Sequence, residues 1–521
     1  MLKYADILRL LRPLVIDRSF VRPVGDGAAA EAGLDLIMET VSVLEYDTDY
    51  LPGAELSGVF NDSRQVIADS VFAAIPGARC NGEDFAATAM QKGAKVVISE
   101  RNLQSIMQPG TVNLVVKSAY TAYALLCNLQ YDYPVRTMTG FAVTGTNGKT
   151  TTAMLLRKLL NAAGKSCGLI STVEYDMGCG NIESADRTTP EAGKLFAAFN
   201  TMRSNKLSCY AMEVSSHALA QDRIADLSYQ AVIFTNLTGD HLDYHHTMEE
   251  YFRVKTLLFT QHLAADGQAI INSDDPWGKK LHQKIAPEKA VTFGINQGDW
   301  RIVNINCGRN GSSFELHNGS ACYQLQTNLA GLYNIYNITG ALLALHTTGT
   351  LDLADSARLL AENPLSVPGR LEGFELRNGA TAFVDYAHTP DALSNVLTTL
   401  RKLAPNRLYC VFGCGGDRDT TKRPKMGRIA AELADEITIT SDNPRSESPE
   451  AIINEIASGI SNVSSRVNIE PDRRAAIIRT VEKAQTGDII LIAGKGHENY
   501  QEIAGVKHPF DDRQVVSEFL K

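Results

Sequence analysis

A glycine-rich turn behind an apolar run decides the fold of this chain, and it reads Phe141-Ala142-Val143-Thr144-Gly145-Thr146-Asn147-Gly148-Lys149-Thr150-Thr151-Thr152. The apolar residues predict a strand, and Met154-Leu155-Leu156 beyond the turn predict a helix that begins near Lys149. Glycines let backbone N–H groups turn toward an anion, and the start of the helix adds its positive end. We therefore predict a nucleoside triphosphate site with Mg²⁺. Its expected contacts are Gly145, Thr146, Asn147, Gly148, Lys149, Thr150 and Thr151, a hydroxyl of the last two facing the metal.

This loop is a shortened variant of the usual pattern. The position five residues before Gly148 carries Val143, where the common P-loop has glycine. A plain turn between strand and helix is the alternative interpretation. Lysine and two threonines directly after the glycine, at the start of a helix, favour the phosphate site.

Composition restricts the function classes. The chain has 521 residues, 44% hydrophobic and 21% charged, which is typical of a globular protein of about three domains. A formal net charge of −9 argues against a general nucleic-acid binder but leaves room for a local basic pocket. Residues 1–11 lack the apolar core of a secretory signal, and no run is long enough to span a bilayer. These features predict a cytoplasmic protein without a membrane partner.

The nine cysteines are scattered singly, and the closest pair in the sequence is Cys410 and Cys414. This spacing offers neither a CxxC metal knuckle nor an evenly paired disulfide framework. We expect reduced thiols, mostly in the core.

Strands and helices alternate along the chain, which predicts an α/β protein of three domains. The first, residues 1–136, opens with a short helix and has strands at 70–75 and 95–98, whereas 25–30 is not assigned. The second, 137–367, contains a parallel sheet covered on both faces, a short antiparallel piece within 298–328, and a helix at 333–346. The third is 368–521. Further strands are expected at 166–171, 209–213, 230–236, 268–272, 381–386, 408–413, 436–440 and 488–494.

Polar residues follow several of these strands. Ligands of open α/β sheets bind at the carboxyl ends of strands, so Asp385, 417–418, 442–445 and 494–498 are expected to line one crevice. Glu213 ends a strand of the second domain and is a candidate Mg²⁺ carboxylate, with a solvated strand-end glutamate as the alternative.

His241 follows the next strand, and His245 shares a helical face with it. Without an HExxH order and with oxygen-rich surroundings, His241 as a single ligand of a Mg²⁺-class ion is favoured over a zinc pair. A helix-capping or solvated histidine is the alternative. Lys255 lies toward the apolar side of a helix with Tyr251 and Leu258, and a snorkelling lysine explains this position adequately.

Taken together, the motifs resemble the Mur ligase family, and within it the MurE type, over most of the chain. The matching segments are GTNGKTT, 213–217, 236–241, 251–255, 329–337, Pro368-Gly369-Arg370 and Asp442-Asn443-Pro444-Arg445. The resemblance implies an N-terminal domain for a UDP moiety, a central ATPase, and a C-terminal Rossmann-like domain for an amino acid. It also implies that Lys255 is carbamylated by CO₂ and joins Glu213 and His241 around Mg²⁺.

The resemblance assigns further residues. The implied adenosine contacts are Asn272, Asp274 and Asn337, with Arg370 reaching the nucleotide from the third domain. The implied contacts of the muramoyl dipeptide are Thr188, Thr189, Ser215, Gln221 and Arg223, and those of the UDP are Ser63 and Arg64. The implied amino-acid contacts are Arg418, Asp442, Asn443, Pro444, Arg445, Gly494 and Glu498. Asn81-Gly82-Glu83 departs from the Asp-Gly-His usual in the family, and His388 receives no role.

The resemblance implies an ATP-dependent amide ligase that adds meso-diaminopimelate to UDP-N-acetylmuramoyl-L-alanyl-D-glutamate through an acyl phosphate, and that acts as a monomer. A guanidinium at Arg445 suits the distal carboxylate that lysine lacks, whereas a surface arginine is the plain alternative. The same reaction with L-lysine, another Mur ligase or a folylpolyglutamate-type ligase are the nearest rivals. A non-catalytic nucleotide switch is a rival of another class, and 413–418 lacks the last glycine of a dinucleotide-binding GxGxxG.

Overall fold

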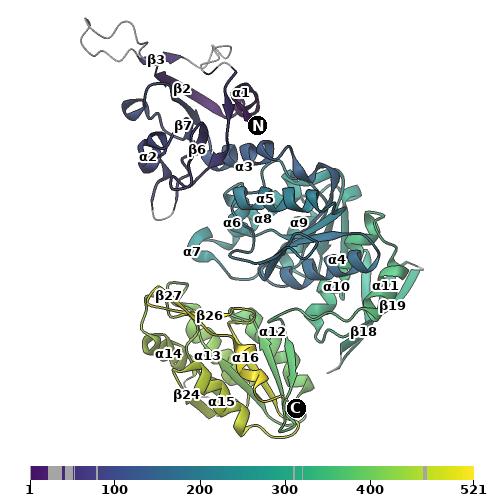
Figure 1. The fold of residues 1–521 in the computed structure, drawn as a ribbon. Helices are drawn as coiled ribbons and strands as arrows, with labels where there is room; N and C mark the ends of the chain where they lie inside the picture. Colours follow the sequence, from purple (N-terminus) through teal and green to yellow (C-terminus); the bar gives the residue numbers. More distant parts are fainter. Residues whose placement is uncertain are drawn as a thin grey trace, which may run out of the picture.

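The computed structural model describes residues 2–21, 38–41, 51, 53–77, 80–308, 311–319, 321–460 and 466–520. The unassigned stretch 25–30 lies outside these residues. Three sheets follow one another along the molecule, from the purple N-terminal part through the teal centre to the yellow C-terminal part (Figure 1). The predicted α/β architecture is confirmed. No helix in the described ranges has the length and apolar character needed to cross a bilayer.

The N-terminal part is built on a six-stranded sheet of order β3-β2-β8-β7-β6-β5. The expected opening helix is α1. The elements are β1 (Leu2–Lys3), α1 (Tyr4–Leu11), β2 (Val15–Val21), β3 (Met38–Val41), β4 (Glu55–Leu56), β5 (Val59–Phe60), β6 (Ser70–Ala73), α2 (Ala86–Gln91), β7 (Ala94–Ser99), β8 (Val112–Val116) and α3 (Ala119–Gln130).

The central part is an 11-stranded sheet of order β12-β11-β10-β13-β9-β14-β15-β16-β17-β18-β19. Its strands are β9 (Thr139–Thr144), β10 (Cys167–Ile170), β11 (Glu174–Asp176), β12 (Ile182–Ser184), β13 (Cys209–Glu213), β14 (Tyr229–Phe234), β15 (Leu263–Asn272), β16 (Ala290–Gly294), β17 (Trp300–Gly308), β18 (Gly311–Asn318) and β19 (Ala321–Thr327). Its helices are α4 (Lys149–Ala162), α5 (Ala192–Ser204), α6 (Ser216–Ala220), α7 (Leu242–His245), α8 (Met248–Gln261), α9 (Pro276–His282), α10 (Leu332–Thr347) and α11 (Leu353–Glu362).

Strand β9 shows why an apolar run becomes a central strand. Phe141 and Val143 pack with α4 and α10 on one face, whereas Ala142 packs in the core that contains α5 and α8 on the other. A strand buried on both faces needs apolar residues at successive positions, so its sequence has no alternation. Because β13, β9 and β14 are parallel neighbours, their carboxyl ends lie side by side.

The antiparallel piece expected within 298–328 is present. Strands β17, β18 and β19 form a meander that extends the central sheet, because β17 pairs with β16 in parallel. The central sheet is therefore mixed, with parallel strands in its centre and antiparallel pairs toward both edges.

The C-terminal part has a six-stranded sheet of order β20-β21-β25-β22-β23-β24. Its elements are β20 (Glu372–Glu375), β21 (Thr381–Asp385), α12 (Pro390–Leu403), β22 (Leu408–Phe412), α13 (Lys422–Leu433), β23 (Glu436–Ile439), α14 (Pro449–Ala457), β24 (Arg466–Ile469), α15 (Arg473–Lys483), β25 (Ile489–Ala493), β26 (Tyr500–Ile503), β27 (Val506–Pro509) and α16 (Asp512–Ser517). β20, β24 and the β26–β27 hairpin are not among the predicted strands.

Candidate functional site

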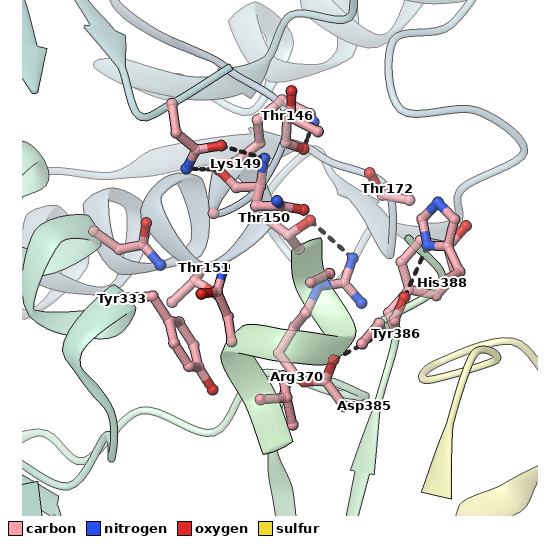
Figure 2. Close-up of a pocket in the computed structure, with 18 of the residues that line it drawn as sticks. Thr146, Lys149, Thr150, Thr151, Thr172, Tyr333, Arg370, Asp385, Tyr386 and His388 are labelled. Carbon is pink, nitrogen blue, oxygen red and sulfur yellow. Dashed lines mark hydrogen bonds between the residues drawn. The ribbon is translucent and has the colours of Figure 1, made fainter. Parts of the chain in front are cut away.

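A cavity of about 230 Å³ lies between the central and C-terminal sheets (Figure 2). The carboxyl ends of β9, β13 and β14 open onto it from one side, and the segment after β21 closes it from the other. The predicted residues that line it are Thr146, Asn147, Gly148, Lys149, Thr150, Thr151, Thr188, Glu213, His241, Asn337 and Arg370. Residues that sequence reasoning did not select also line it, among them Thr172, Asp240, Tyr333, Tyr386 and Asn395.

The glycine-rich loop is held in one shape by its neighbours. Gly148 has φ +90 and forms the N-cap of α4, and a Cβ there would lie 2.2 Å from Asn337 Oδ1. The hydroxyl of Thr235 donates to the Asn147 carbonyl at 2.6 Å, and the Thr146 N–H donates to the Asn236 carbonyl at 2.9 Å. The first backbone N–H groups of α4 therefore face the cavity, as an anion site at a helix N-terminus requires.

Lys149 lies against its own loop. Its Nζ donates to the carbonyls of Gly145 at 3.0 Å and Thr146 at 2.8 Å. Burial lowers the pKa of the ammonium, while Glu213 and Asp240 oppose that shift. A bound phosphate would add a further negative charge beside this half-buried cation and so favour its charged form.

Glu213 is fully buried at the end of β13, where both of its carboxylate oxygens accept hydrogen bonds from Thr172. The backbone N–H of Thr172 donates to its Oε1 at 2.8 Å, and the hydroxyl of Thr172 donates to its Oε2 at 3.0 Å. The alternative of a solvated strand-end glutamate is wrong. Thr172 follows β10, whose carboxyl end lies next to that of β13, so strand order is the signal that would have found it.

His241 precedes helix α7 in a left-handed conformation with φ 55. Burial lowers its pKa to about 4, although Asp240, with Oδ2 3.4 Å from Nε2, opposes the shift. The imidazole is therefore neutral near pH 7 and has a lone pair for a cation. His245 is not available as a second ligand of the same ion, because its Nε2 lies 2.9 Å from the hydroxyl of Ser216.

The cavity side chains fit a hydrated hard cation better than a closed metal cage. Within the described residues, Glu213, Asp240 and His241 do not form a group with all ligand atoms within 4.8 Å of one another. Mg²⁺ binds through few carboxylates and keeps several waters, so a loose, oxygen-rich set around a phosphate site suits it.

Lys255 is buried, which contradicts the snorkelling interpretation. Its side chain runs under the phosphate loop, where Nζ donates to the Gly145 carbonyl at 3.0 Å and the Thr144 hydroxyl at 3.3 Å. Burial, and after it the charge of Lys149, holds the pKa of Lys255 well below the ordinary lysine value. The partners come from a strand and turn more than 100 positions earlier, which helix periodicity does not reveal.

Two of the expected adenosine contacts lie outside the cavity lining. Asn272 donates through Nδ2 to the Thr235 carbonyl at 2.8 Å, and Asp274 accepts the Tyr336 hydroxyl at 2.6 Å. Both therefore support the segments behind the phosphate loop.

The residues expected to hold the dipeptide form one connected group beside Glu213. Thr189 Oγ1 donates to the Glu213 carbonyl at 2.9 Å and accepts the Ser215 N–H at 3.0 Å. Arg223 donates to the Thr189 carbonyl at 2.8 Å and to Gln221 Oε1 at 2.6 Å. Ser63 and Arg64 lie apart from this group in the N-terminal part, where Arg64 pairs with Asp62 at 2.7 Å.

The segments 442–445 and 494–498, which were expected to line one crevice, are in direct contact, whereas Asp385 of the same group lines the cavity beside the phosphate loop. Asn443 donates to Glu498 Oε2 at 2.8 Å, and the buried Lys495 donates to both residues at 3.0 Å. Asp442 is buried, which favours its protonated form, yet the charges of Lys495 and Arg473 hold its pKa below the usual value. The segment 442–445 thus contacts the loop after β25. Gly494 packs closely against Asp442, because a Cβ on this glycine would lie only 2.5 Å from Asp442 Oδ2.

Arg445 follows these residues on the loop after β23 and has φ 53. Its Nη1 donates to the Gly416 carbonyl at 2.6 Å, and its Nε lies 3.5 Å from Glu502 Oε2. Pro444 and Gly416 are in direct contact, since a Cβ on Gly416 would lie 2.0 Å from the Pro444 carbonyl. Arg418 is exposed on the loop after β22.

The two sides of the cavity are joined by direct contacts. Arg370 Nη2 donates to the Thr150 hydroxyl at 3.1 Å (Figure 2), and His497 Nε2 lies 3.1 Å from the Thr172 carbonyl. Asn147 donates to Asp391 Oδ2 at 2.9 Å. Asp391 is a functional candidate that the sequence did not single out, because its partner Asn147 lies in the other part of the molecule. His497 belongs to the segment 494–498 that was expected to line a crevice, but its contact with Thr172 was not predicted.

Family models match three successive parts of the chain. The Mur ligase family catalytic domain matches residues 55–130, the Mur ligase middle domain 143–345, and the Mur ligase glutamate ligase domain 369–496. The chain belongs to the Mur ligase family. The resemblance predicted from the motifs is thereby confirmed.

Several Mur ligases are similar over nearly the full length. The UDP-N-acetylmuramoyl-L-alanyl-D-glutamate--2,6-diaminopimelate ligase of Syntrophomonas wolfei is 42% identical, over 90% of this chain and 95% of its own. The ligase of the same name from Aquifex aeolicus is 40% identical, over 92% and 97%. A solved structure under that name superposes with a TM-score of 0.65 at 34% identity, covering 92% of this chain and 97% of its own.

Proposed function

We propose that this chain is an ATP-dependent ligase that joins meso-diaminopimelate to UDP-N-acetylmuramoyl-L-alanyl-D-glutamate in the synthesis of peptidoglycan precursors. The observation that carries the proposal is the phosphate loop facing Arg370 across one cavity. It occurs in a chain 42% identical, over 90% of its length, to a ligase named for this reaction. The ATP requirement is the reason for proposing a cytoplasmic location, and we propose a monomer because each chain supplies both sides of the cavity.

The reaction proceeds in two steps. The side-chain carboxylate of the D-glutamyl residue attacks the γ-phosphorus of ATP, and the bond to the β-phosphate oxygen breaks to leave ADP and an acyl phosphate. The neutral amine of diaminopimelate then attacks the acyl carbon, forming an amide and releasing inorganic phosphate and a proton. Neither step needs a covalent bond to the protein, so catalysis rests on positioning and charge stabilisation.

Lys149, the start of α4 and Arg370 are positioned for that stabilisation. The first two approach the phosphates from the central sheet, and Arg370 approaches from the C-terminal part. Negative charge that develops on the transferring phosphoryl group is stabilised by donors already in place. Because Arg370 belongs to the C-terminal side of the cavity, Lys149, the start of α4 and Arg370 can act together only when the two sides are in contact.

Glu213 and the neutral His241 are the residues that we propose to hold Mg²⁺, with Asp240 next to them in the cavity. A bound Mg²⁺ would neutralise phosphate charge. The hydroxyl of Thr150 is another oxygen on this surface, although it accepts a hydrogen bond from Arg370.

We also propose that Lys255 carries a carbamate. CO₂ reacts with the neutral form of an amine, and the lowered pKa of Lys255 supports that form. The product would replace a buried cation by an anion beneath a loop that already contains Lys149.

For amino-acid selection, we propose that Arg445 pairs with the distal carboxylate of diaminopimelate. We propose that Asp442, Asn443 and Glu498 bind the amino and carboxylate groups at the opposite end of this substrate. A guanidinium suits a carboxylate by two parallel hydrogen bonds. L-lysine has no distal carboxylate and would form no such pair with Arg445, which disfavours lysine.

Phosphate release with purified protein, ATP, Mg²⁺ and the UDP-linked dipeptide tests the proposal. We expect release with meso-diaminopimelate, little with L-lysine, and none when either co-substrate is omitted. Lys149→Ala should abolish release. Steady ATP hydrolysis without the co-substrates would favour a nucleotide switch, turnover with L-lysine alone would overturn the assigned specificity, and turnover with a folate and glutamate would favour the folylpolyglutamate alternative.

A further inference from the structure

A cluster on the central meander has no part in the proposed reaction. Glu315, His317 and Cys322 bring a carboxylate, an imidazole and a thiol together, with all ligand atoms within 4.8 Å of one another. None of them lines the cavity beside the phosphate loop. They lie on β18 and β19, and β19 is the last strand of the central sheet.

Strand geometry accounts for the convergence. Glu315 and His317 are two positions apart on β18, so their side chains share one face of the sheet. Cys322 is the cross-strand partner of His317 in the antiparallel register of β18 and β19. Three different side chains are thereby held on a single hairpin, and sheet pairing rather than a loop fixes their spacing.

The three ligand atoms surround a common point. His317 Nε2 lies 2.9 Å from Glu315 Oε2 and 3.2 Å from Cys322 Sγ, and the sulfur lies 3.9 Å from the same carboxylate oxygen. In a catalytic triad, one ring nitrogen of the histidine bonds to the carboxylate and the other bonds to the nucleophile. Here one nitrogen faces both partners, so the arrangement is that of a ligand set.

The distances suit a small tetrahedral cation. With bonds of about 2.0–2.3 Å to nitrogen, oxygen and sulfur, neighbouring ligand atoms around tetrahedral Zn²⁺ lie roughly 3.4–3.6 Å apart. The observed separations of 2.9, 3.2 and 3.9 Å bracket this range. Small side-chain rotations would adjust them, without movement of the paired strands.

A further contact orients the carboxylate. Asn304 donates through Nδ2 to Glu315 Oε2 at 2.9 Å. It lies in the irregular part of β17, where the register with β18 shifts between Val303 and Asn306, and it has φ 51. Hydrogen bonds to ligating carboxylates are typical of metal sites, because they fix the direction of the ligand.

From these contacts we infer that Glu315, His317 and Cys322 form a binding site for a borderline-soft divalent cation of the Zn²⁺ class. Thiolate and imidazole select against Mg²⁺, so the site is chemically distinct from the oxygen-rich cavity used by the nucleotide. Three protein ligands leave a fourth position for water. Glu315 and Cys322 also line a second cavity of about 720 Å³ beside α11, which gives solvent access to the cluster.

Titration of the full-length, chelator-treated protein with Co²⁺ tests this inference. Cobalt bound to a thiolate gives a charge-transfer band in the near ultraviolet, and no cysteine lines the nucleotide cavity to produce it there. We expect a band that saturates at one equivalent and is displaced by Zn²⁺. Cys322→Ser should abolish the band, and His317→Gln should weaken Zn²⁺ binding by about 100-fold or more, since even loss of a supporting contact costs about 10–100-fold.

Matched variants make the result specific. Cys307→Ser, on the neighbouring strand β17, should keep the band, and Asn304→Ala should weaken Zn²⁺ binding about 10-fold. Circular dichroism and phosphate release should be unchanged in Cys322→Ser, which shows that the variant is folded. Absence of the band in the unaltered protein, or its persistence in both Cys322→Ser and His317→Gln, would reduce the cluster to a hydrogen-bonded surface group and overturn the inference.

Discussion

Two lysines, Lys149 and the buried Lys255, donate to one carbonyl oxygen. Lys149 and Lys255 both donate to the carbonyl of Gly145 at 3.0 Å. Two ammonium groups on the same acceptor repel each other, and with burial this favours loss of a proton from one of them. The pKa values of both lysines are lowered, and that of Lys255 lies well below its ordinary value. Of the two, Lys255 is therefore the one that we propose to react with CO₂.

Replacing Lys255 tests that role. Lys255→Ala should lower the rate of phosphate release at least about 100-fold, because the loop and the cation site lose an anion beneath them. Added formate or acetate should restore part of the rate by occupying the vacated space. Lys165→Ala, at an exposed lysine between α4 and β10, is the matched control and should act like the unaltered protein. An unchanged rate in Lys255→Ala would remove the carbamate from the mechanism.

Arg445 permits a second test on a single side chain. Arg445→Ala should raise the KM for meso-diaminopimelate by about 10- to 150-fold, the equivalent of a charge-assisted hydrogen bond of about 1.5–3 kcal/mol. The KM for ATP should stay the same, since Arg445 contacts Gly416 and Glu502 in the C-terminal part. Arg428→Ala, an exposed arginine on α13, provides the comparison. Equal KM values for diaminopimelate in the two variants would assign its distal carboxylate to another residue.

At the scale of elements, a glycine flanks each end of helix α4, and the two glycines have different surroundings. Gly148 has φ +90 and its Cβ would lie 2.2 Å from Asn337 Oδ1, whereas Gly164 has φ +76 and open space around it. Gly148→Ala should therefore abolish measurable ATP binding, because the loop must move away from Asn337. Gly164→Ala should cost about 1 kcal/mol of backbone strain and leave ATP binding intact. Calorimetric titration with ATP and thermal unfolding separate the two effects, and equal losses of affinity would contradict the steric argument.

Elements with strong local signals were predictable from the sequence. The strand expected at 209–213 is β13 with the same bounds, and the helix expected near Lys149 begins there. Both have long apolar runs and clear turn residues at their ends. The meander lies where it was expected, but its pairing with β16 was not predicted, because the sequence of a strand does not name its neighbour. Strand β24 was missed because its four residues contain only two apolar ones, Val467 and Ile469.

The candidate site was predictable where one segment carries it. The phosphate loop and Glu213 are examples, since each follows directly from a strand end. Lys255 and Thr172 depend on partners from distant segments, and local pattern alone assigned the wrong role to the first and none to the second. His497 was expected to line a crevice with the rest of 494–498, but its contact with Thr172 was not predicted. For Lys255, only the family resemblance indicated a function before the structure was known.

At the scale of the whole molecule, the cavity exists because two sheets meet. Contacts of Arg370 with Thr150, His497 with Thr172 and Asp391 with Asn147 cross from one to the other. Each donor or acceptor on the central side belongs to the phosphate loop or to the segment beside Glu213. Contact between the central and C-terminal parts, called closure below, therefore also assembles the phosphate site. Separation of the two sheets would move Arg370 away from the nucleotide.

His497 makes this closure dependent on pH. Its neutral ring fits its surroundings, because Nε2 donates to the Thr172 carbonyl at 3.1 Å while Nδ1 faces Arg370 Nη1 at 3.4 Å. Burial, with the charge of Arg370 next, lowers its pKa to about 3. In a separated form the ring would regain an ordinary pKa of about 6.5. The separated form then binds more protons between these values, so closure weakens as pH falls below about 6.5, by at most about 1.4 kcal/mol per pH unit.

Small-angle X-ray scattering of the ligand-free protein measures this effect. The radius of gyration should grow as the pH is lowered from 7.5 to about 5. His497→Gln retains a donor for Thr172 and an acceptor for Arg370 but cannot be protonated, so its radius should depend less on pH. Other buried histidines, such as His388, titrate in both proteins, and the difference between the two curves isolates His497. Identical curves would show that protonation of His497 does not control the contact between the sheets.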